Sequence, residues 1–385
     1  MTGSASSHLN FTNGQVLTPQ GAVETPFRLT IIDGRIATMQ TVAGPEDGDE
    51  LVDLEGGWLS PGLIDLQVNG GGGVLFNDDP TPEGLAAIGR AHLAHGVTGF
   101  MPTLVSATPD IIAQALDAVD AAIAAGEQQV LGVHVEGPFI SPERRGIHTP
   151  ERMRRLDETA MALLTRPRRG RVMITLAPEL CEPGQIEAMV RAGVIVSLGH
   201  SDADVAQARQ AFQAGARGVT HLFNAMSPLH HRAPGLVGAA LDDPQAWCGL
   251  IADGVHVDPV ALRLAFRVKG AERLNLVSDS MPPIGVQMDA FVIDGRRILV
   301  RDGRYVGEDG ALAGADLTLD QAVRGTVDMM GASVGQAVQM ASASPAAFLG
   351  LDDRGVLAPG ARADLLWLDA ALRPRGVWRG GLRVI

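Results

Sequence analysis

Cysteines, aromatic residues and basic side chains are all scarce in this chain. Its two cysteines, Cys181 and Cys248, have no spacing typical of a metal site, and we interpret them as reduced thiols that pack as small apolar side chains. Lys and Arg number 31 against 44 Asp and Glu, so the formal net charge is −13. Since a phosphate backbone is bound by clustered Lys and Arg, we expect no nucleic-acid partner. A small anionic substrate is compatible with this charge, because one or two local cations can hold it.

Long apolar runs are also missing. No stretch reaches the ~20 residues that a membrane-spanning helix needs. The N-terminal residues MTGSASSHLNFTNG lack the basic and apolar regions of a signal peptide. We therefore expect a cytoplasmic protein with no membrane partner. Apolar residues still make up 46% of the chain, which is enough to fill a buried core and argues against disorder.

The long middle of the chain has the pattern of an α/β barrel. From residue 61 to about 350, apolar strands alternate with amphipathic helical stretches; the candidate strands are 63–69, 97–104, 129–136, 171–177, 194–200, 218–224, 247–253 and 274–279. Eight such units are typical of a closed, TIM-like (β/α)8 barrel of parallel strands. A doubly wound open sheet is the alternative, but no G-x-G-x-x-G turn opens the first unit.

The two ends of the chain are predicted as β structure. Residues 1–60 contain short strands and tight turns, including a hairpin turn at Asp33-Gly34. Residues 351–385 again alternate apolar and polar side chains, so we expect both ends to form one small β-sandwich beside the barrel. A β insert with Asp-Gly turns is predicted near residues 285–315, after the eighth strand.

Three candidate metal ligands stand at the C-terminal tips of predicted strands. Glu136 ends VLGVHVE, His200 follows VIVSLG, and His221 lies in RGVTHLF. The carboxyl ends of barrel strands meet on one face, where barrel enzymes keep their chemistry. Two imidazoles and a carboxylate are ligands that a catalytic ion takes while leaving a position for water. Any one of these residues alone is more often a hydrogen-bonded structural residue, so the prediction depends on all three.

The last strand and the first strand add further polar groups. Asp279 ends LNLVSD, where an ionised carboxylate needs a partner. Beside a metal-bound water it would act as a general base and then return the proton to a leaving amine; alone, it could simply cap a turn. Gln67 and Asn69 share one face of the first strand by its two-residue period. Because they are neutral, we expect water or substrate contacts from them rather than strong ligation of a second ion.

Loop residues provide candidates for substrate binding. Arg232, in HHRAPG, and His256, in IADGVHVD, could together bind a phosphate, since a guanidinium offers a bidentate fork. Arg232 could equally be a solvated loop cation. His148, in RRGIHTP, would by itself be a surface histidine.

Several longer stretches resemble the amidohydrolase superfamily. The similarity runs from about Leu51 to the C-terminus, and the combination of HVEGPF, THLFNAM and IADGVHVD is similar to the branch that deacetylates N-acetylated sugar phosphates. Many members of the superfamily carry His-x-His on the first strand, where this chain has Gln67 and Asn69. The resemblance therefore implies one divalent metal ion per subunit rather than two, with zinc preferred and iron or manganese as alternatives.

The resemblance also implies a role for each candidate residue. Glu136, His200 and His221 would bind the metal, and Asp279 would be the catalytic acid and base. His148 would contact the amide or sugar near the reacting centre, and the sugar phosphate would be held by Asn224, Ala225, Arg232 and His256. Members of this branch are homodimers in which the partner chain can complete the phosphate site, which is implied here for Arg232.

The activity implied is metal-dependent hydrolysis of the N-acetyl group of N-acetyl-D-glucosamine 6-phosphate. A metal-bound water would be the nucleophile, and glucosamine 6-phosphate and acetate would be the products, as in amino-sugar catabolism or cell-wall recycling. One alternative is an amidohydrolase that acts on a different amide. The other is a non-catalytic scaffold that keeps the fold.

Overall fold

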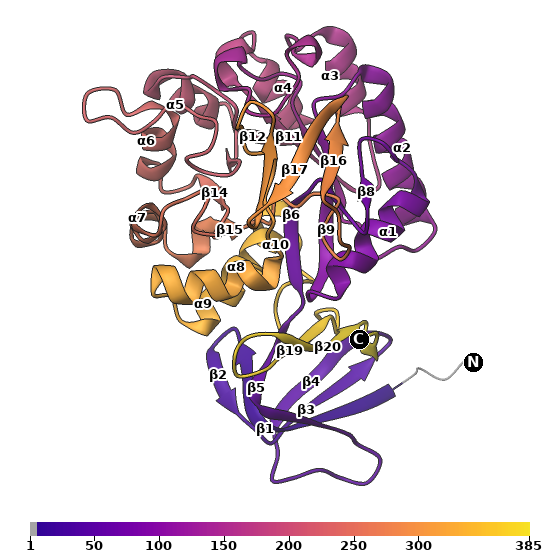
Figure 1. The fold of residues 1–385 in the computed structure, drawn as a ribbon. Helices are drawn as coiled ribbons and strands as arrows, with labels where there is room; N and C mark the ends of the chain where they lie inside the picture. The colour runs from indigo at the N-terminus through magenta and orange to yellow at the C-terminus, as the bar shows by residue number, and fades with distance from the viewer. Residues whose placement is uncertain (1–5) are drawn as a thin grey trace.

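The computed structural model describes residues 6–385, which form a barrel and a separate sheet (Figure 1). Eight parallel strands lie side by side in the barrel, in the spatial order β15-β14-β13-β12-β11-β10-β9-β6. They are β6 (Leu63–Val68), β9 (Val97–Val105), β10 (Gly132–Glu136), β11 (Arg171–Leu176), β12 (Ile195–Leu198), β13 (Gly218–Val219), β14 (Trp247–Leu250) and β15 (Leu274–Leu276). The first and last strands meet where Val68 and Ser280 form an isolated parallel bridge. The predicted closed barrel is confirmed, and the open-sheet alternative is wrong.

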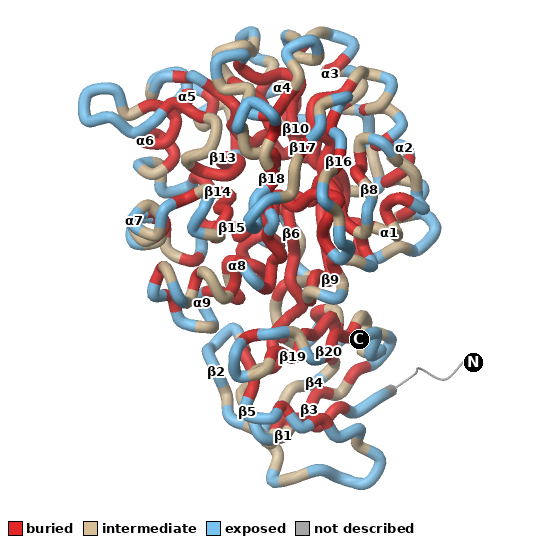
Figure 2. The backbone as a smooth tube through the Cα atoms, viewed as in Figure 1, coloured by how far each residue is buried: buried red, intermediate tan, exposed pale blue. Residues whose placement is uncertain are grey.

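Burial on both faces explains why these strands read as nearly continuous apolar runs. Almost every residue of β6, β9, β10 and β12 is buried, as parallel strands covered by helices on one face and by the barrel interior on the other should be. Figure 2 shows this as a continuous buried core under an exposed shell of helices and loops. Polar residues of these strands thus lie either inside the barrel or at its rim.

Helices connect the barrel strands and cover their outer face. In chain order they are α1 (Pro82–Leu93), α2 (Pro109–Ala124), α3 (Glu158–Thr165), α4 (Gln185–Arg191), α5 (Val205–Gln213), α6 (Gly235–Asp242), α7 (Pro259–Lys269), α8 (Leu319–Gly325), α9 (Val334–Met340) and α10 (Ala343–Leu349), with a π-helical turn at Thr326–Met330. Capping residues in the sequence explain where some of these helices begin. Thr81 accepts a hydrogen bond from Gly84 N–H at the start of α1, and Asp204 forms a capping box with Gln207 at the start of α5.

Both chain ends contribute to the second sheet, which lies below the barrel in Figure 1. Its strands are β1 (Ser6–Thr18), β2 (Gly21–Glu24), β3 (Phe27–Ile32), β4 (Arg35–Thr41), β5 (Glu50–Pro61), β19 (Leu365–Leu368), β20 (Pro374–Arg379) and β21 (Leu382–Arg383). The two ends are joined where β5 pairs with β19, and the sheet has its own apolar core. The predicted hairpin turn is confirmed, because β3 and β4 pair across Asp33 and Gly34, which both have positive φ. The domain limits at residues 60 and 350 stay a prediction.

A three-stranded insert packs over one side of the barrel mouth. It comprises β16 (Ala290–Ile293), β17 (Arg296–Arg301) and β18 (Arg304–Gly307), as expected from the Asp-Gly turns. Its apolar side chains pack against Leu75, Ile147 and Met281, which lie in the loops after β6, β10 and β15. Leu75 belongs to the short strand β8 (Val74–Leu75), which pairs with β7 (Gly70–Gly71). Across residues 6–385 we find no helix with the length and apolar character that a membrane crossing requires.

Candidate metal centre

Three side chains from different strand ends converge inside the barrel mouth. Glu136 ends β10, His200 follows β12, and His221 follows β13. Glu136 Oε1 lies 3.0 Å from His221 Nε2 and 3.5 Å from His200 Nε2, and the two imidazole nitrogens are 3.1 Å apart. All three side chains are buried. The strand-end pattern of the sequence thus corresponds to a real cluster in space.

The spacing of these three atoms fits ligands of one cation. Ligand atoms about 2.0–2.2 Å from a tetrahedral ion lie ~3.3 Å from one another, and the observed separations of 3.0–3.5 Å lie around this value. Two facing imidazole nitrogens must share a hydrogen unless a cation accepts a lone pair from each. The donor set of two imidazoles and one carboxylate therefore fits a divalent ion.

The surroundings of the cluster favour a charged carboxylate and a ligating imidazole. Burial raises the pKa of Glu136, but hydrogen bonds with His200 and His221 outweigh it and hold that pKa well below its usual value. His200 Nδ1 lies 2.8 Å from the carbonyl oxygen of Arg144, which can accept the ring hydrogen at that nitrogen. Nε2 of His200 is then left with a lone pair that faces Glu136 and His221.

Asp279 lies beside this cluster and is held by two amide groups. Its Oδ1 accepts hydrogen bonds from Gln67 Nε2 at 3.0 Å and Asn69 Nδ2 at 2.7 Å, and Gln67 Nε2 also donates to Glu136 Oε1 at 3.0 Å. Burial and then the charge of Glu136 raise the pKa of Asp279 to about 6. A carboxylate with a pKa closer to neutrality is a better general base than an ordinary aspartate. Gln67 and Asn69 thus position the two carboxylates.

Backbone strain is concentrated at these strand ends. His200, His221 and Asp279 have φ values of 47°, 32° and 49°, in the left-handed region that non-glycine residues rarely occupy. Such conformations cost on the order of 1–3 kcal/mol each and persist where the surrounding structure enforces them. The strain turns each side chain into the barrel mouth and is an independent sign of a functional site.

His148 is the fourth polar residue at the cluster. Its exposed fraction is 2%, so the expectation that it would by itself be a surface histidine is wrong. Its ring lies 4.4 Å from that of His200, and Ser106 Oγ lies 2.7 Å from its Nδ1. Glu136, His148 and His200 offer ligand atoms that all lie within 4.8 Å of one another. The shorter separations of the Glu136, His200 and His221 set make that set the better ligand group.

The loop after β10 must pass close to these groups, which explains a glycine in HVEGPF. Gly137 has φ +75°, and a Cβ there would lie 2.4 Å from Ser106 Oγ, the partner of His148. Any side chain at this position would displace Ser106. The sequence therefore joins a candidate ligand, Glu136, directly to a residue that permits the close approach.

The remaining candidates lie at the rim of the mouth. His256 follows β14, and its Nδ1 lies 2.6 Å from Asp253 Oδ2. Asn224 donates hydrogen bonds from Nδ2 to the carbonyl oxygens of His221 and Leu222, and Ala225 has φ 49°. Arg232 lies in an exposed loop, residues 228–233, that leads into α6. The roles of these four residues in holding a sugar phosphate stay predictions.

Sequence reasoning missed two buried groups beneath the cluster. Asp65 Oδ1 accepts hydrogen bonds from the backbone N–H groups of Gln67 and Ser278, which joins β6 to the segment before Asp279. Burial raises the pKa of Asp65 to about 7. His134 Nε2 lies 2.7 Å from Thr175 Oγ1 inside the barrel, and burial lowers the pKa of His134 to about 4. Asp65 could have been found from the sequence, because the two-residue period of a strand places it on the same face as Gln67 and Asn69.

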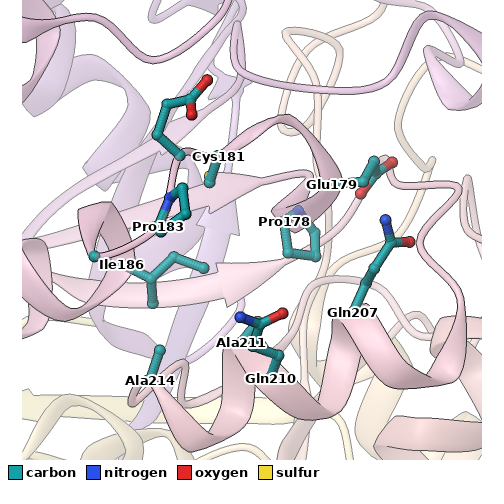
Figure 3. A pocket seen from close by; sticks show the side chains of 11 residues that line it. Pro178, Glu179, Cys181, Pro183, Ile186, Gln207, Gln210, Ala211 and Ala214 are labelled. Carbon is teal, nitrogen blue, oxygen red and sulfur yellow. The ribbon is translucent and has the colours of Figure 1, made fainter.

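A surface pocket of about 200 Å³ lies outside the barrel mouth, between α5 and the segment before α4 (Figure 3). Figure 3 shows Cys181 and Ile186 on one side and Gln207 and Gln210 on the other. Both cysteines are free thiols, as expected, and burial raises the pKa of Cys181 to about 12, so it stays protonated. Cys181 therefore offers no thiolate nucleophile in this pocket, and the convergence of polar groups at the barrel mouth remains the candidate site.

Comparisons with known proteins identify the family to which the chain is related. A model of the amidohydrolase family matches residues 58–382. A protein of Shewanella sp. (strain ANA-3) named N-acetylgalactosamine-6-phosphate deacetylase is 39% identical over 373 residues, which cover 96% of this chain and 94% of that protein. A Bos taurus protein named N-acetylglucosamine-6-phosphate deacetylase is 38% identical over 392 residues, covering 97% and 94%.

The same relationship is found among solved structures. The crystal structure of N-acetylglucosamine-6-phosphate deacetylase from Pasteurella multocida superposes with a TM-score of 0.94 at 32% sequence identity. The match covers 98% of this chain and 99% of that chain. The barrel, the insert and the sheet of both chain ends therefore belong to one shared architecture.

Proposed function

The chain belongs to the amidohydrolase family, and on this premise we propose that it hydrolyses the N-acetyl group of N-acetyl-D-glucosamine 6-phosphate. The products are glucosamine 6-phosphate and acetate. The observation that carries the proposal is the convergence of Glu136, His200 and His221 to within 3.5 Å beside Asp279. The names of the relatives, at 38–39% identity over nearly the whole chain, support the choice of substrate.

Glu136, His200 and His221 would hold one divalent ion. When bound, such an ion lowers the pKa of water and polarises a carbonyl oxygen. We propose zinc as the bound ion, and iron or manganese would suit the same donor atoms. Gln67 supports a single ion, because its amide hydrogens, rather than a second cation, lie between the carboxylates of Glu136 and Asp279.

Asp279 is the proposed acid and base. Its carboxylate accepts the proton of the attacking water and later donates it to the glucosamine nitrogen as the C–N bond breaks. Gln67 and Asn69 fix the carboxylate in place for both transfers. His148 lies beside His200 within the mouth, where it can donate a hydrogen bond to the amide or to a sugar hydroxyl. Its neutrality supports this, since burial lowers the pKa of His148 to about 3.

A phosphate requirement tests the proposed substrate. Arg232 and His256 would hold the phosphate, and charge-assisted hydrogen bonds contribute about 1.5–3 kcal/mol each. We expect kcat/KM for N-acetylglucosamine 6-phosphate to exceed that for N-acetylglucosamine by ~10²-fold or more, measured by acetate release. Equal rates on the two sugars would instead favour an amidohydrolase for a different amide. No hydrolysis of any acetylated sugar, with no bound metal, would favour a non-catalytic scaffold.

N-Acetylgalactosamine 6-phosphate is a second candidate substrate. The Shewanella relative with that activity in its name is as similar to this chain as the Bos taurus relative named for the glucosamine sugar. The two sugars differ only in the configuration at C4, which is remote from the acetamido group. The same assay with both phosphorylated sugars separates them by their kcat/KM ratio.

A homodimer is part of the proposal. α7 exposes Val260, Leu264 and Val268, whose exposed fractions are 56%, 52% and 59%, along one helical face. α7 contacts α6, which follows the exposed loop that carries Arg232. A second copy docked on this side would cover the apolar stripe and bring its own Arg232 loop close to the interface.

A cytoplasmic location stays a prediction.

Substituting Leu264 by glutamate is expected to convert the dimer to a monomer, because it places a charge in an apolar interface. Light scattering coupled to gel filtration should give the mass of two 40.3 kDa chains for the parent and of one for the variant. Leu382→Glu is the matched control, since Leu382 is 74% exposed in the sheet of the chain ends and should leave the dimer intact. An unchanged dimer in Leu264→Glu would place the interface elsewhere.

A further inference from the structure

A small cavity lies inside the barrel, directly beneath the metal-binding side chains. About 10 Å³ of it is open to the centres of water molecules, which is close to what one water needs. Apolar and polar residues both line it, and the polar ones are Gln67, Ser197, Thr220, His221 and Asn275. Ser197 lies in β12, Asn275 lies in β15, and Thr220 and His221 follow β13, so the cavity connects the barrel interior to a proposed metal ligand.

Two buried polar atoms at this cavity have no hydrogen-bond partner among the described residues. They are Nδ1 of His221 and Oδ1 of Asn275, and the two residues are only 4% and 2% exposed. Buried polar groups in proteins are almost always paired, with protein atoms or with an ordered water. A donor and an acceptor that line the same one-water cavity are complementary partners for such a water.

The hydroxyl groups around the cavity are already partly engaged. Thr220 Oγ1 lies 2.6 Å from Thr175 Oγ1 and 2.8 Å from Ser197 Oγ. Each hydroxyl still has a free lone pair, because a hydroxyl can donate once and accept twice. Ser197 and Thr220 can therefore complete the coordination of a water, while the unpaired atoms of His221 and Asn275 determine its orientation.

This arrangement matters because it bears on which ring nitrogen of His221 carries the hydrogen. Nε2 of His221 faces Glu136 and His200, so it can bind a cation only when the ring hydrogen is on Nδ1. His200 has its own carbonyl partner at Nδ1, the backbone oxygen of Arg144. Nδ1 of His221 has no such partner among residues 6–385, although ligating histidines nearly always donate their other N–H to a fixed acceptor.

We propose that a buried water, held by Asn275, accepts the Nδ1 hydrogen of His221 and fixes that ring in its metal-binding tautomer. Asn275 is thus a positioning residue that acts through the water and His221 and touches neither the ion nor the substrate. The inference rests on the metal role of His221 proposed above. It explains why a polar amide occupies the centre of β15, which is otherwise apolar as LNL.

Zinc affinity of the full-length chain tests this role. Asn275→Leu keeps the branched shape of the side chain but removes the acceptor, and we expect the dissociation constant for zinc, measured by chelator competition at neutral pH, to rise ~10–100-fold. Asn275→Asp keeps an oxygen acceptor and should bind zinc within about 3-fold of the parent. In the zinc-loaded parent and Asp variant, proton NMR should show slowly exchanging downfield imidazole N–H resonances for both His200 and His221, and Asn275→Leu should lack the His221 resonance.

A second cavity variant separates this effect from simple repacking. Met173 lines the apolar side of the same cavity, and Met173→Leu conserves volume without touching a hydrogen bond, so it should leave zinc affinity unchanged. Thermal unfolding of the metal-free proteins reports any loss of stability separately. Zinc binding by Asn275→Leu within 3-fold of the parent, with the His221 resonance retained, would overturn the proposal. A parent chain that binds no zinc would overturn the metal centre itself.

Discussion

Asp279→Asn is expected to lower kcat by ~10²–10⁴-fold, the usual contribution of general acid–base catalysis, while leaving the metal content unchanged. Asparagine has the shape of aspartate but cannot take a proton from water at neutral pH. The carboxylate of Asp279 lies beside the metal-binding group and shares the Gln67 amide with Glu136, so the substitution changes the proton acceptor and leaves the three ligands in place. Steady-state acetate release and metal analysis measure the two effects separately.

The control for this substitution is Asp242→Asn. Asp242 is the last residue of α6 and forms an exposed ion pair with Arg209 at 2.8 Å, so its loss should affect neither kcat nor metal content. Near-normal acetate release from Asp279→Asn would remove Asp279 from the mechanism. Loss of the metal together with activity would instead identify Asp279 as a ligand.

The cluster of Glu136, His200 and His221 could be predicted because its residues follow a simple rule of barrel architecture. Glu136 is the last residue of an apolar strand, His200 and His221 each come two residues after one, and strand ends of a parallel barrel meet on one face. No knowledge of loop conformation is needed to bring such residues together. The same reasoning located the barrel strands to within a few residues, since strands buried on both faces read as short apolar runs.

Residues on loops and inside the barrel could not be placed in the same way. The burial of His148 depends on how the loop after β10 folds back over Ser106, which no local pattern encodes. Asn275 reads in the sequence as one polar residue in a short apolar strand. Its significance depends on a cavity and on the unpaired Nδ1 of His221, and these appear only once side chains from several strands are packed together.

The candidate phosphate-binding residue Arg232 shows a different limit of prediction from sequence. Arg232 is in a loop whose residues 228–233 are all exposed, and in the proposed dimer its distance from a bound sugar would depend on the partner chain as well. A sequence motif can indicate a guanidinium suited to phosphate, but the geometry of such a contact is set by the assembly. The dimer test and the phosphate-requirement assay therefore address the same part of the proposal.

Glu136→Gln is expected to reduce hydrolysis by ~10³-fold or more. The ion supplies several kcal/mol of transition-state stabilisation, and every ~1.36 kcal/mol corresponds to a factor of ten in rate. Glutamine keeps the shape of the side chain but removes the only negative charge among the three proposed ligands. Metal content should fall with activity, in contrast to the expected result for Asp279→Asn. Glu187→Gln, on the exposed face of α4, is the matched control.

Zinc-dependent stability distinguishes loss of the ion from loss of the fold in Glu136→Gln. A ligand that binds only the folded state, at a thousandfold excess over its Kd, stabilises by about 4 kcal/mol, which should raise the unfolding temperature of the parent and of Glu187→Gln. The Glu136→Gln protein should fold yet show little such shift. Because Glu136 Oε1 lies within 3.5 Å of both imidazole nitrogens, an unaltered zinc response would mean that the ion binds away from all three side chains.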